Sequence, residues 1–335
     1  KTKTNPSVGC IVVKNNSVIS SGYTSSNGRP HAEFNALNFN KNFKDSNLYV
    51  TMEPCTHYGL TPPCSNLIIK KGIKHVFFSF NDLDPRTSKK FKEKFLKKKI
   101  KITKKKIHEY KDFYQSYFST HKKKELFVDA KLALSKDYFT ISKKSKWITN
   151  QPSRKRAHLI RSEYDAIVST SKSINNDNSI LNCRLNGFDN RKPDLIVIDR
   201  HFSIKKNLDI FKNNIQRKIF IVILKKNIKK KFYFKNKNIK FIEVKSLTSK
   251  NDFKYLFSLI KKYGYNRVLI ESGLTFLNKL LLNKSIYNLY VFQTLYNLKK
   301  EGKNNASNSF IKKLKFQKKV KVNLNSDSLY KIKVK

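Results

Sequence analysis

One histidine, one glutamate and two cysteines in the first 64 residues have the types and spacing of a catalytic zinc site. His31 and Glu33 are followed by Cys55 and Cys64. One imidazole and two thiolates supply three ligands for Zn2+ and leave a fourth position for water, which is typical of catalytic rather than structural zinc sites. Glu33 is two residues from His31, so it can exchange a proton with that water without binding the metal. We predict Glu33 as the catalytic acid–base.

The order of these residues is the signature of zinc-dependent deaminases, His-x-Glu followed by Pro-Cys and a later Cys. A structural zinc site is the alternative, but it would need a fourth protein ligand, and His57 lies too close to Cys55 to serve well. Most deaminases space the cysteines as C-x-x-C. Here eight residues separate Cys55 from Cys64.

This long loop, together with Asn5-Pro6 upstream and the His-x-Glu motif, resembles the bifunctional deaminase/reductase of riboflavin biosynthesis. The resemblance implies that residues 1–122 form a cytidine-deaminase-like three-layer domain. This domain would deaminate 2,5-diamino-6-(5-phosphoribosylamino)pyrimidin-4-one, with Asn5 and His57 contacting the substrate. It also implies that residues 125–335 form a dihydrofolate-reductase-like domain, which would reduce the ribosyl side chain to ribityl with NADPH.

Short segments of the second half support the same resemblance. Residues 131–137 are similar to the first strand and loop of the family's reductase, and residues 145–149 to its nicotinamide-side segment. The resemblance implies contacts to NADPH from Leu134, Ser145, Trp147, Ser173, Asp177 and Gly273. It implies contacts to the sugar phosphate from Lys131, Asp137, Arg161, Arg184 and Glu271.

The chemistry of these side chains supports some of the roles and leaves others open. Arginine suits bidentate binding of phosphate, and Arg161 and Arg184 are two of only ten arginines, although surface charge is the plainer alternative. Gly273 would let backbone N–H groups approach a phosphate, or it is an ordinary turn glycine. Trp147 either packs against a ligand or fills the core. Asp137 either orients the sugar or is an exposed loop residue.

Several places depart from the family pattern, and three of them bear on the proposed sites. Leu60 stands where Arg or Lys is usual, Tyr138 replaces a glycine, and Asn178-Ser179 replace Asp-Pro. A deaminase with a degenerate reductase domain, or a non-catalytic binding module, is therefore an alternative to the two-step enzyme. The retained Glu33 argues against the binding module.

The elements that position these residues alternate between strands and helices, which predicts two α/β domains. The lysine run at 122–124 marks the boundary between them. In the first half we expect strands at 8–13, 18–22, 48–52, 76–80 and 100–103, and helices at 31–40, 63–71, 91–98 and 110–121. In the second half we expect strands at 127–133, 166–169, 195–198, 220–224, 268–271 and 287–293, helices at 153–161, 252–263 and 275–282, and a terminal hairpin of 320–324 with 329–334.

The net charge of +49 makes a nucleic-acid deaminase of the tRNA-editing type the competing function. However, most of the cations are lysines spread along an Asn- and Ile-rich chain, so we expect a small-molecule substrate and no specific nucleic-acid partner. Four cysteines in 335 residues are not a disulfide framework and favour a cytoplasmic setting. Apolar runs of about six residues are too short to span a membrane, which needs roughly 20. Formation of a homo-oligomer stays open.

Overall fold

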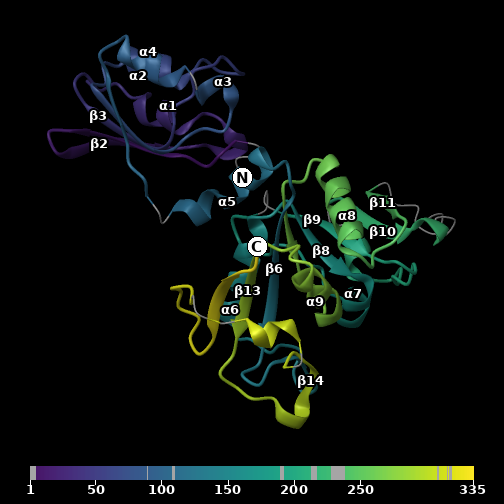
Figure 1. Ribbon diagram of the computed structural model, residues 1–335. Coiled ribbons are helices and arrows are strands. Elements are labelled where there is room, and N and C mark those ends of the chain that lie inside the picture. The colour runs from purple at the N-terminus through teal and green to yellow at the C-terminus, as the bar shows by residue number, and fades with distance from the viewer. Residues whose placement is uncertain are drawn as a thin grey trace. The chain divides into compact units, whose positions relative to one another are not determined.

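The computed structural model describes residues 5–88, 90–107, 110–188, 192–212, 217–227, 238–307, 309–314, 316 and 319–335. The chain divides into two compact units, Lys1–Lys124 and Glu125–Lys335 (Figure 1). Each unit has its own sheet with helices packed on it, so the predicted α/β class is confirmed. Within the described ranges, no helix is both long and apolar enough to cross a membrane.

The first unit is built on a five-stranded sheet of order β2-β1-β3-β4-β5. β1 is antiparallel to β2 and β3, whereas β3, β4 and β5 are parallel. The strands are β1 (Gly9–Lys14), β2 (Ser17–Tyr23), β3 (Asn47–Met52), β4 (His75–Phe80) and β5 (Lys101–Lys104). The helices are α1 (Ala32–Leu37), α2 (Cys64–Lys70), α3 (Pro85–Ser88), α4 (Phe91–Leu96) and α5 (Lys111–Lys122), with the short 3-10 helix η1 (Ser26–Gly28).

Side chains of alternate residues in β3 point to opposite faces of this sheet, and both faces are covered. Leu48 packs in a buried cluster with Leu37 of α1 and Ile68 of α2. Thr51 points the other way, and its Oγ1 lies 2.6 Å from the hydroxyl of Tyr114 in α5. The first unit therefore has three layers, with α5 on the face opposite to α1 and α2.

The second unit contains an eight-stranded sheet of order β11-β10-β9-β8-β12-β6-β13-β15. All neighbouring strands are parallel except the edge strand β15, which is antiparallel to β13. The strands are β6 (Phe127–Leu134), β8 (Ala166–Thr170), β9 (Asp194–Ile198), β10 (Ile219–Leu224), β11 (Ile239–Val244), β12 (Arg267–Ile270), β13 (Asn288–Gln293) and β15 (Ser328–Lys333). A separate two-stranded ribbon pairs β7 (Phe139–Ser142) with β14 (Gly302–Asn305).

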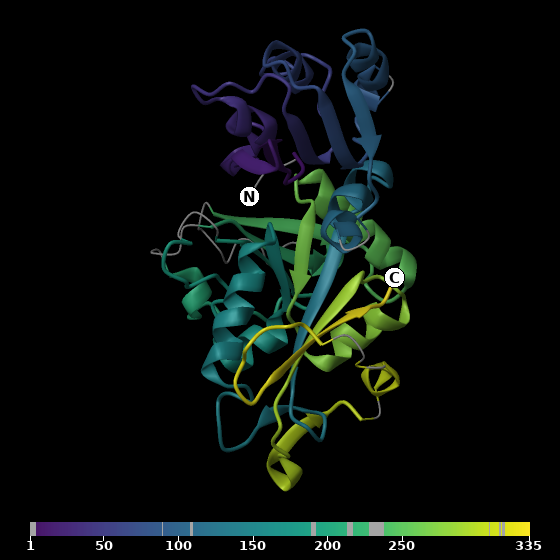
Figure 2. The same cartoon turned by 90° about the vertical axis from the view of Figure 1, so that its left-hand side faces the viewer.

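Helices cover both faces of the large sheet (Figure 2). One buried cluster joins alternate strand residues to α8 (Lys250–Lys262) and α9 (Leu274–Leu282), and a second joins the others to α6 (Gln151–Ser162) and α7 (Ser171–Asp177). Burial on both faces explains why β10 reads as an unbroken apolar run. The short 3-10 helices are η4 (Asp209–Phe211), η6 (Lys299–Glu301) and η7 (Phe310–Lys313).

The predicted terminal hairpin is wrong in one of its two strands. Residues 320–324 form no strand, and this region contributes only the single bridge of Lys319 with Tyr330. β15 instead pairs along its whole length with β13. The sequence pattern also missed α3, α7, β7, β11 and β14, which are short or rich in polar residues.

Candidate metal centre and reductase site

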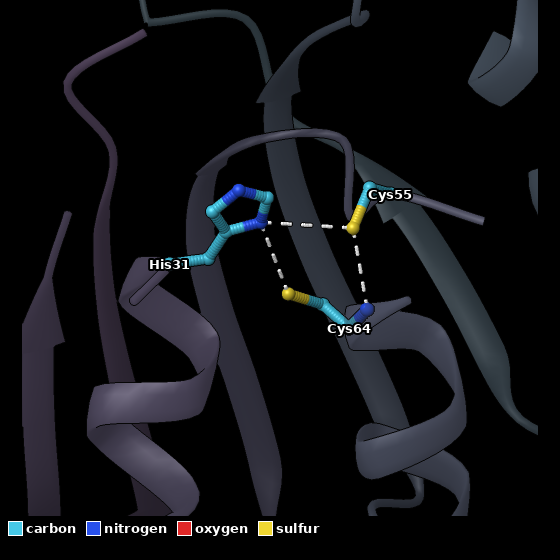
Figure 3. A group of neighbouring side chains, drawn as sticks. All are labelled: His31, Cys55 and Cys64. Carbon is cyan, nitrogen blue, oxygen red and sulfur yellow. Dashed lines mark hydrogen bonds between the residues drawn. The ribbon is translucent and has the colours of Figure 1, made fainter. Parts of the chain in front are cut away.

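Three elements of the first unit bring metal-ligating side chains together. His31 directly precedes α1, Cys55 lies in the loop after β3, and Cys64 is the first residue of α2. Figure 3 shows the three side chains pointing toward one another. His31 Nδ1 lies 3.7 Å from Cys55 Sγ and 3.4 Å from Cys64 Sγ. The three donor atoms all lie within 4.8 Å of one another.

These distances fit a tetrahedral zinc ion. Zn–S bonds of about 2.3 Å and Zn–N bonds of about 2.0–2.1 Å place the nitrogen and each sulfur about 3.6 Å apart. The two observed separations, 3.4 and 3.7 Å, lie on either side of that value. Across the part of the chain that the structure describes, no other group of three His, Cys, Asp or Glu side chains converges in this way. The donor set therefore suits zinc and leaves one coordination position for a further ligand.

Two neighbouring side chains that could have ligated the metal face other partners. His57 Nδ1 lies 3.0 Å from Thr87 Oγ1, and its Nε2 lies 3.8 Å from an Asp84 oxygen. Glu53 accepts hydrogen bonds from the Asn81 side chain and the Asp82 backbone. The fourth protein ligand of a structural site is not found among the described residues.

The pKa values of the two cysteines are shifted in opposite directions. A hydrogen bond from the Cys64 thiol lowers the pKa of Cys55 to about 4, and the same interaction raises the pKa of Cys64. The backbone N–H of Cys64, at the start of α2, also donates to Cys55 Sγ over 3.2 Å. The Cys55 sulfur is thus held as a thiolate, the form that binds metal.

Glu33 lies in the first turn of α1 and is 4% exposed. Burial, helped by the negative charge on Cys55, raises the pKa of Glu33 to about 7. A carboxyl group with this pKa can take up and release a proton near neutral pH.

The position of α1, and so of His31 and Glu33, depends on the lack of a side chain at Gly22 in β2. A Cβ atom there would lie 2.5 Å from both Ala32 O and Ala36 N. No other residue type allows α1 to approach β2 so closely.

The predicted substrate contacts of this unit lie around the metal centre. Asn5 Nδ2 donates to Gly28 O over 2.8 Å and lies 3.4 Å from His31 Nε2, the ring nitrogen that does not face the cysteines. Leu60, at the tip of the loop between the cysteines, is 89% exposed. The Arg29 guanidinium donates to Thr61 Oγ1 in the same loop over 2.5 Å.

In the second unit, a buried ion-pair network lies where β6 and β12 run side by side. Ile270, the last residue of β12, pairs with Ala130, so Glu271, which follows it directly, comes level with Lys131 of β6. Lys131 Nζ lies 2.9 Å from Glu271 Oε2. Arg161 of α6 binds the same carboxylate through Nε at 2.5 Å and Nη2 at 2.8 Å. β12 enters the sheet between β8 and β6, and ligands of parallel sheets bind at the carboxyl ends of strands near such a change in order.

Arg184, which was predicted to contact the sugar phosphate, adjoins this network through Asn182, a residue that the sequence did not single out. Arg161 Nη1 donates to Asn182 O over 3.2 Å, and Arg184 Nη1 donates to Asn182 Oδ1 over 2.8 Å. His158 Nδ1 lies 2.9 Å from the same carbonyl oxygen. The signal that could have found His158 is its spacing of three residues before Arg161, which puts both on one face of α6.

Ser173 and Gly273, both predicted to contact the cofactor, touch each other. Gly273 is the N-cap residue of α9, and its N–H donates to Ser173 Oγ over 3.1 Å. Asp177 is the last residue of α7 and is exposed. Ser173 and Gly273 thus lie at the starts of the two helices that follow β8 and β12, whereas Asp177 lies at the far end of α7.

The remaining predicted cofactor contacts have different environments. Trp147 is 52% exposed, with the Arg154 guanidinium 5.1 Å from its ring centre, so the alternative that it fills the core is wrong. The Ser145 hydroxyl donates to Trp147 O over 2.9 Å. The Leu134 side chain is fully buried, and its carbonyl accepts from Thr294 N.

Asp137 is neither an exposed loop residue nor directed at the network of Lys131. Its carboxylate accepts hydrogen bonds from Ser135 Oγ at 2.6 Å, from Leu298 N at 2.9 Å and from Lys299 N at 2.7 Å. These bonds outweigh burial and lower the pKa of Asp137. The carboxylate therefore anchors the segment that leads into β14.

Two family models of known proteins match this chain, one in each of its two compact units. The model of the cytidine and deoxycytidylate deaminase zinc-binding region matches residues 1–80, and the model of the RibD C-terminal domain matches residues 128–294. The riboflavin biosynthesis protein RibD of Aquifex aeolicus is 32% identical over 276 residues, which cover 81% of this chain and 76% of that protein. RibD of Actinobacillus pleuropneumoniae is 29% identical over 276 residues, covering 81% and 73%.

A solved structure extends the match to the whole fold. The crystal structure of a diaminohydroxyphosphoribosylaminopyrimidine deaminase/5-amino-6-(5-phosphoribosylamino)uracil reductase from Thermotoga maritima has a TM-score of 0.83 with this chain at 25% identity. The match covers 100% of this chain and 94% of that one. The predicted resemblance is thereby confirmed: the chain belongs to the RibD family of riboflavin biosynthesis proteins, which are bifunctional deaminase/reductases.

Proposed function

We propose that the first unit hydrolytically deaminates 2,5-diamino-6-(5-phosphoribosylamino)pyrimidin-4-one, and that the second unit reduces the ribosyl side chain of the product to ribityl with NADPH. The substrate named for the Thermotoga maritima protein supports this choice. The observation that carries the proposal is the convergence of His31, Cys55 and Cys64 beside a buried Glu33.

In the deamination, His31, Cys55 and Cys64 would hold Zn2+, which lowers the pKa of a bound water to about 7. Glu33 takes up a proton from the attacking water and delivers it to the departing amino group, which leaves as ammonia. Burial of Glu33 keeps its pKa near neutrality, so it can serve both transfers. Asn5, beside His31, and His57 contact the pyrimidine or the ribose.

In the reduction, NADPH supplies a hydride to the carbonyl carbon of the open-chain sugar when it is bound. The cofactor is held by Leu134, Ser145, Trp147, Ser173, Asp177 and Gly273. The sugar phosphate is bound or positioned by Lys131, Asp137, Arg161, Arg184 and Glu271. Since both Nε and Nη2 of Arg161 already donate to Glu271, Arg184 is the arginine of this pair that contacts the phosphate directly. Asp137 acts through the segment it anchors.

The substrate class implies that the partners are small molecules. The free cysteines are compatible with a cytoplasmic setting, and we propose that location.

Product analysis of Glu33→Gln tests the deaminase assignment. We expect ammonia release to fall at least about 100-fold, while zinc content stays unchanged and the second unit still reduces the deaminated intermediate. Glu53→Gln is the matched control, because Glu53 is equally buried but binds Asn81 and Asp82 instead of facing the metal donors. Near-normal ammonia release by Glu33→Gln would show that the acid–base is a different residue.

A further inference from the structure

We propose that His158 is a positioning residue of the reductase unit, which holds the turn of residues 182–184 so that Arg184 can bind the substrate phosphate. The inference rests on the proposed reductase function and adds a residue that no motif or resemblance indicated.

The contacts of His158 converge on that turn. His158 Nδ1 lies 2.9 Å from Asn182 O and 3.3 Å from the backbone nitrogen of Arg184. A neutral ring nitrogen either donates or accepts, so in the tautomer with the proton on Nδ1 it donates to Asn182 O, which is the shorter of the two contacts. His158 thus contacts the backbone on both sides of Cys183, which is buried. Since α6 carries His158 and packs against the sheet, the ring ties the turn to a fixed element.

The turn is what sets the direction of the Arg184 side chain. Arg184 is exposed, and the one guanidinium contact recorded for it in the described residues is Nη1 to Asn182 Oδ1, within the same turn. Without His158, Asn182 O would keep the 3.2 Å bond from Arg161 Nη1, and the chain before it would stay held by Arg217, whose Nη1 donates to Leu181 O over 3.0 Å. No such bond from another element would remain on the Arg184 side of Asn182 within the described residues. Arg184 would then keep its charge but lose its orientation.

A histidine suits this position because two guanidinium groups approach it. Burial, followed by the charges of Arg161 and Arg184, lowers the pKa of His158 to about 4. The ring is therefore neutral at physiological pH and adds no third positive charge to the group. A lysine at 158 would repel both arginines.

Steady-state kinetics of the full chain with the phosphorylated intermediate and with its dephosphorylated analogue tests the inference. For His158→Ala, we expect the KM of the phosphorylated compound to rise about tenfold, since a lost contact that orients a charged group is of this size. kcat and the KM of the dephosphorylated analogue should change less than threefold. His158→Asn, which keeps a neutral hydrogen-bonding group, should recover part of the affinity.

Controls separate positioning from folding. His201 is an exposed histidine of the same unit, so His201→Ala should change neither KM. Urea unfolding followed by Trp147 fluorescence reports whether the second unit of each variant is folded. If His158→Ala does not fold, the comparison of His158→Asn with wild type decides, and the former must show the weaker phosphate selectivity.

Titration of the full chain with inorganic phosphate gives a readout that needs no turnover. Binding should weaken by the same factor in His158→Ala as in the kinetic assay, and nearly disappear in Arg184→Ala. Equal losses for both compounds, a loss confined to kcat, or unchanged phosphate binding would overturn the inference. Wild-type chain that binds phosphate through Arg184 but reduces nothing would instead refute the proposed function.

Discussion

Glu271→Gln should destabilise the second unit strongly, because Glu271 is the only negative charge recorded between Lys131 and Arg161 in the described residues. The carboxylate is 5% exposed on its side chain and binds Lys131 at 2.9 Å and Arg161 at 2.5 and 2.8 Å. Gln keeps the shape but removes the charge, which leaves two largely buried cations uncompensated. Breaking a buried ion pair in this way costs about 3–5 kcal/mol of unfolding free energy. For a unit of this size, that is a fall of roughly 10 °C in melting temperature.

Urea unfolding followed by Trp147 fluorescence measures this loss, since Trp147 is the only tryptophan of the chain and lies in the second unit. Glu301→Gln is the control: Glu301 pairs with Lys144 but is 42% exposed, so its loss should cost less than about 1 kcal/mol. If Glu271→Gln lost no more than Glu301→Gln, the network would be solvated and the reasoning from burial would be refuted.

Three further predictions concern other residues. Gly22→Ala should prevent α1 from packing on β2, so metal analysis of the purified chain should show a loss of zinc. Trp147 fluorescence should still report a folded second unit. Full zinc content would contradict the close approach of 2.5 Å between the added Cβ and the backbone of α1. Asp137→Asn should cost about 1–3 kcal/mol in urea unfolding, because an amide cannot replace all three bonds of the carboxylate; a loss of kcat without a loss of stability would instead indicate direct action on the substrate. The unfolding free energy of the second unit should fall by about 2 kcal/mol as pH drops from about 6.5 to 4, since His158 takes up its proton in the unfolded chain before it does so in the folded one. Urea titrations at several pH values check this, and His158→Asn should remove that part of the pH dependence.

The metal centre could be predicted from the sequence because its chemistry limits the residue types. Few side chains bind zinc, and the spacing of His31, Glu33, Cys55 and Cys64 leaves little choice of partners. The long strands were predictable for a similar reason, since burial on both faces makes β9 and β10 almost wholly apolar and β6 apolar at six of its eight positions.

The contacts of the second unit were less predictable, because they join residues distant in sequence. No local pattern shows that the Arg161 guanidinium is bound by Glu271, or that Asp137 accepts bonds from the backbone of Leu298 and Lys299. The edge strand β15 illustrates the same limit. Both residues 320–324 and β13 were possible partners for β15. Its pairing with β13 depends on the packing of the whole unit, which no local sequence pattern shows.

The place of β6 in the large sheet has a consequence for how the chain folds as it is synthesised. β6 is the first strand of its unit, but its two neighbours are β12 and β13, which begin at Arg267 and Asn288. At translation rates of about 5–20 residues per second, β6 waits roughly 7–30 s before either partner has been made. The first unit, whose sheet closes within residues 9–104, can fold during that interval. We therefore expect the second unit to depend more on chaperones than the first. Its largely apolar first strand stays unpaired on the ribosome until most of the chain has been made.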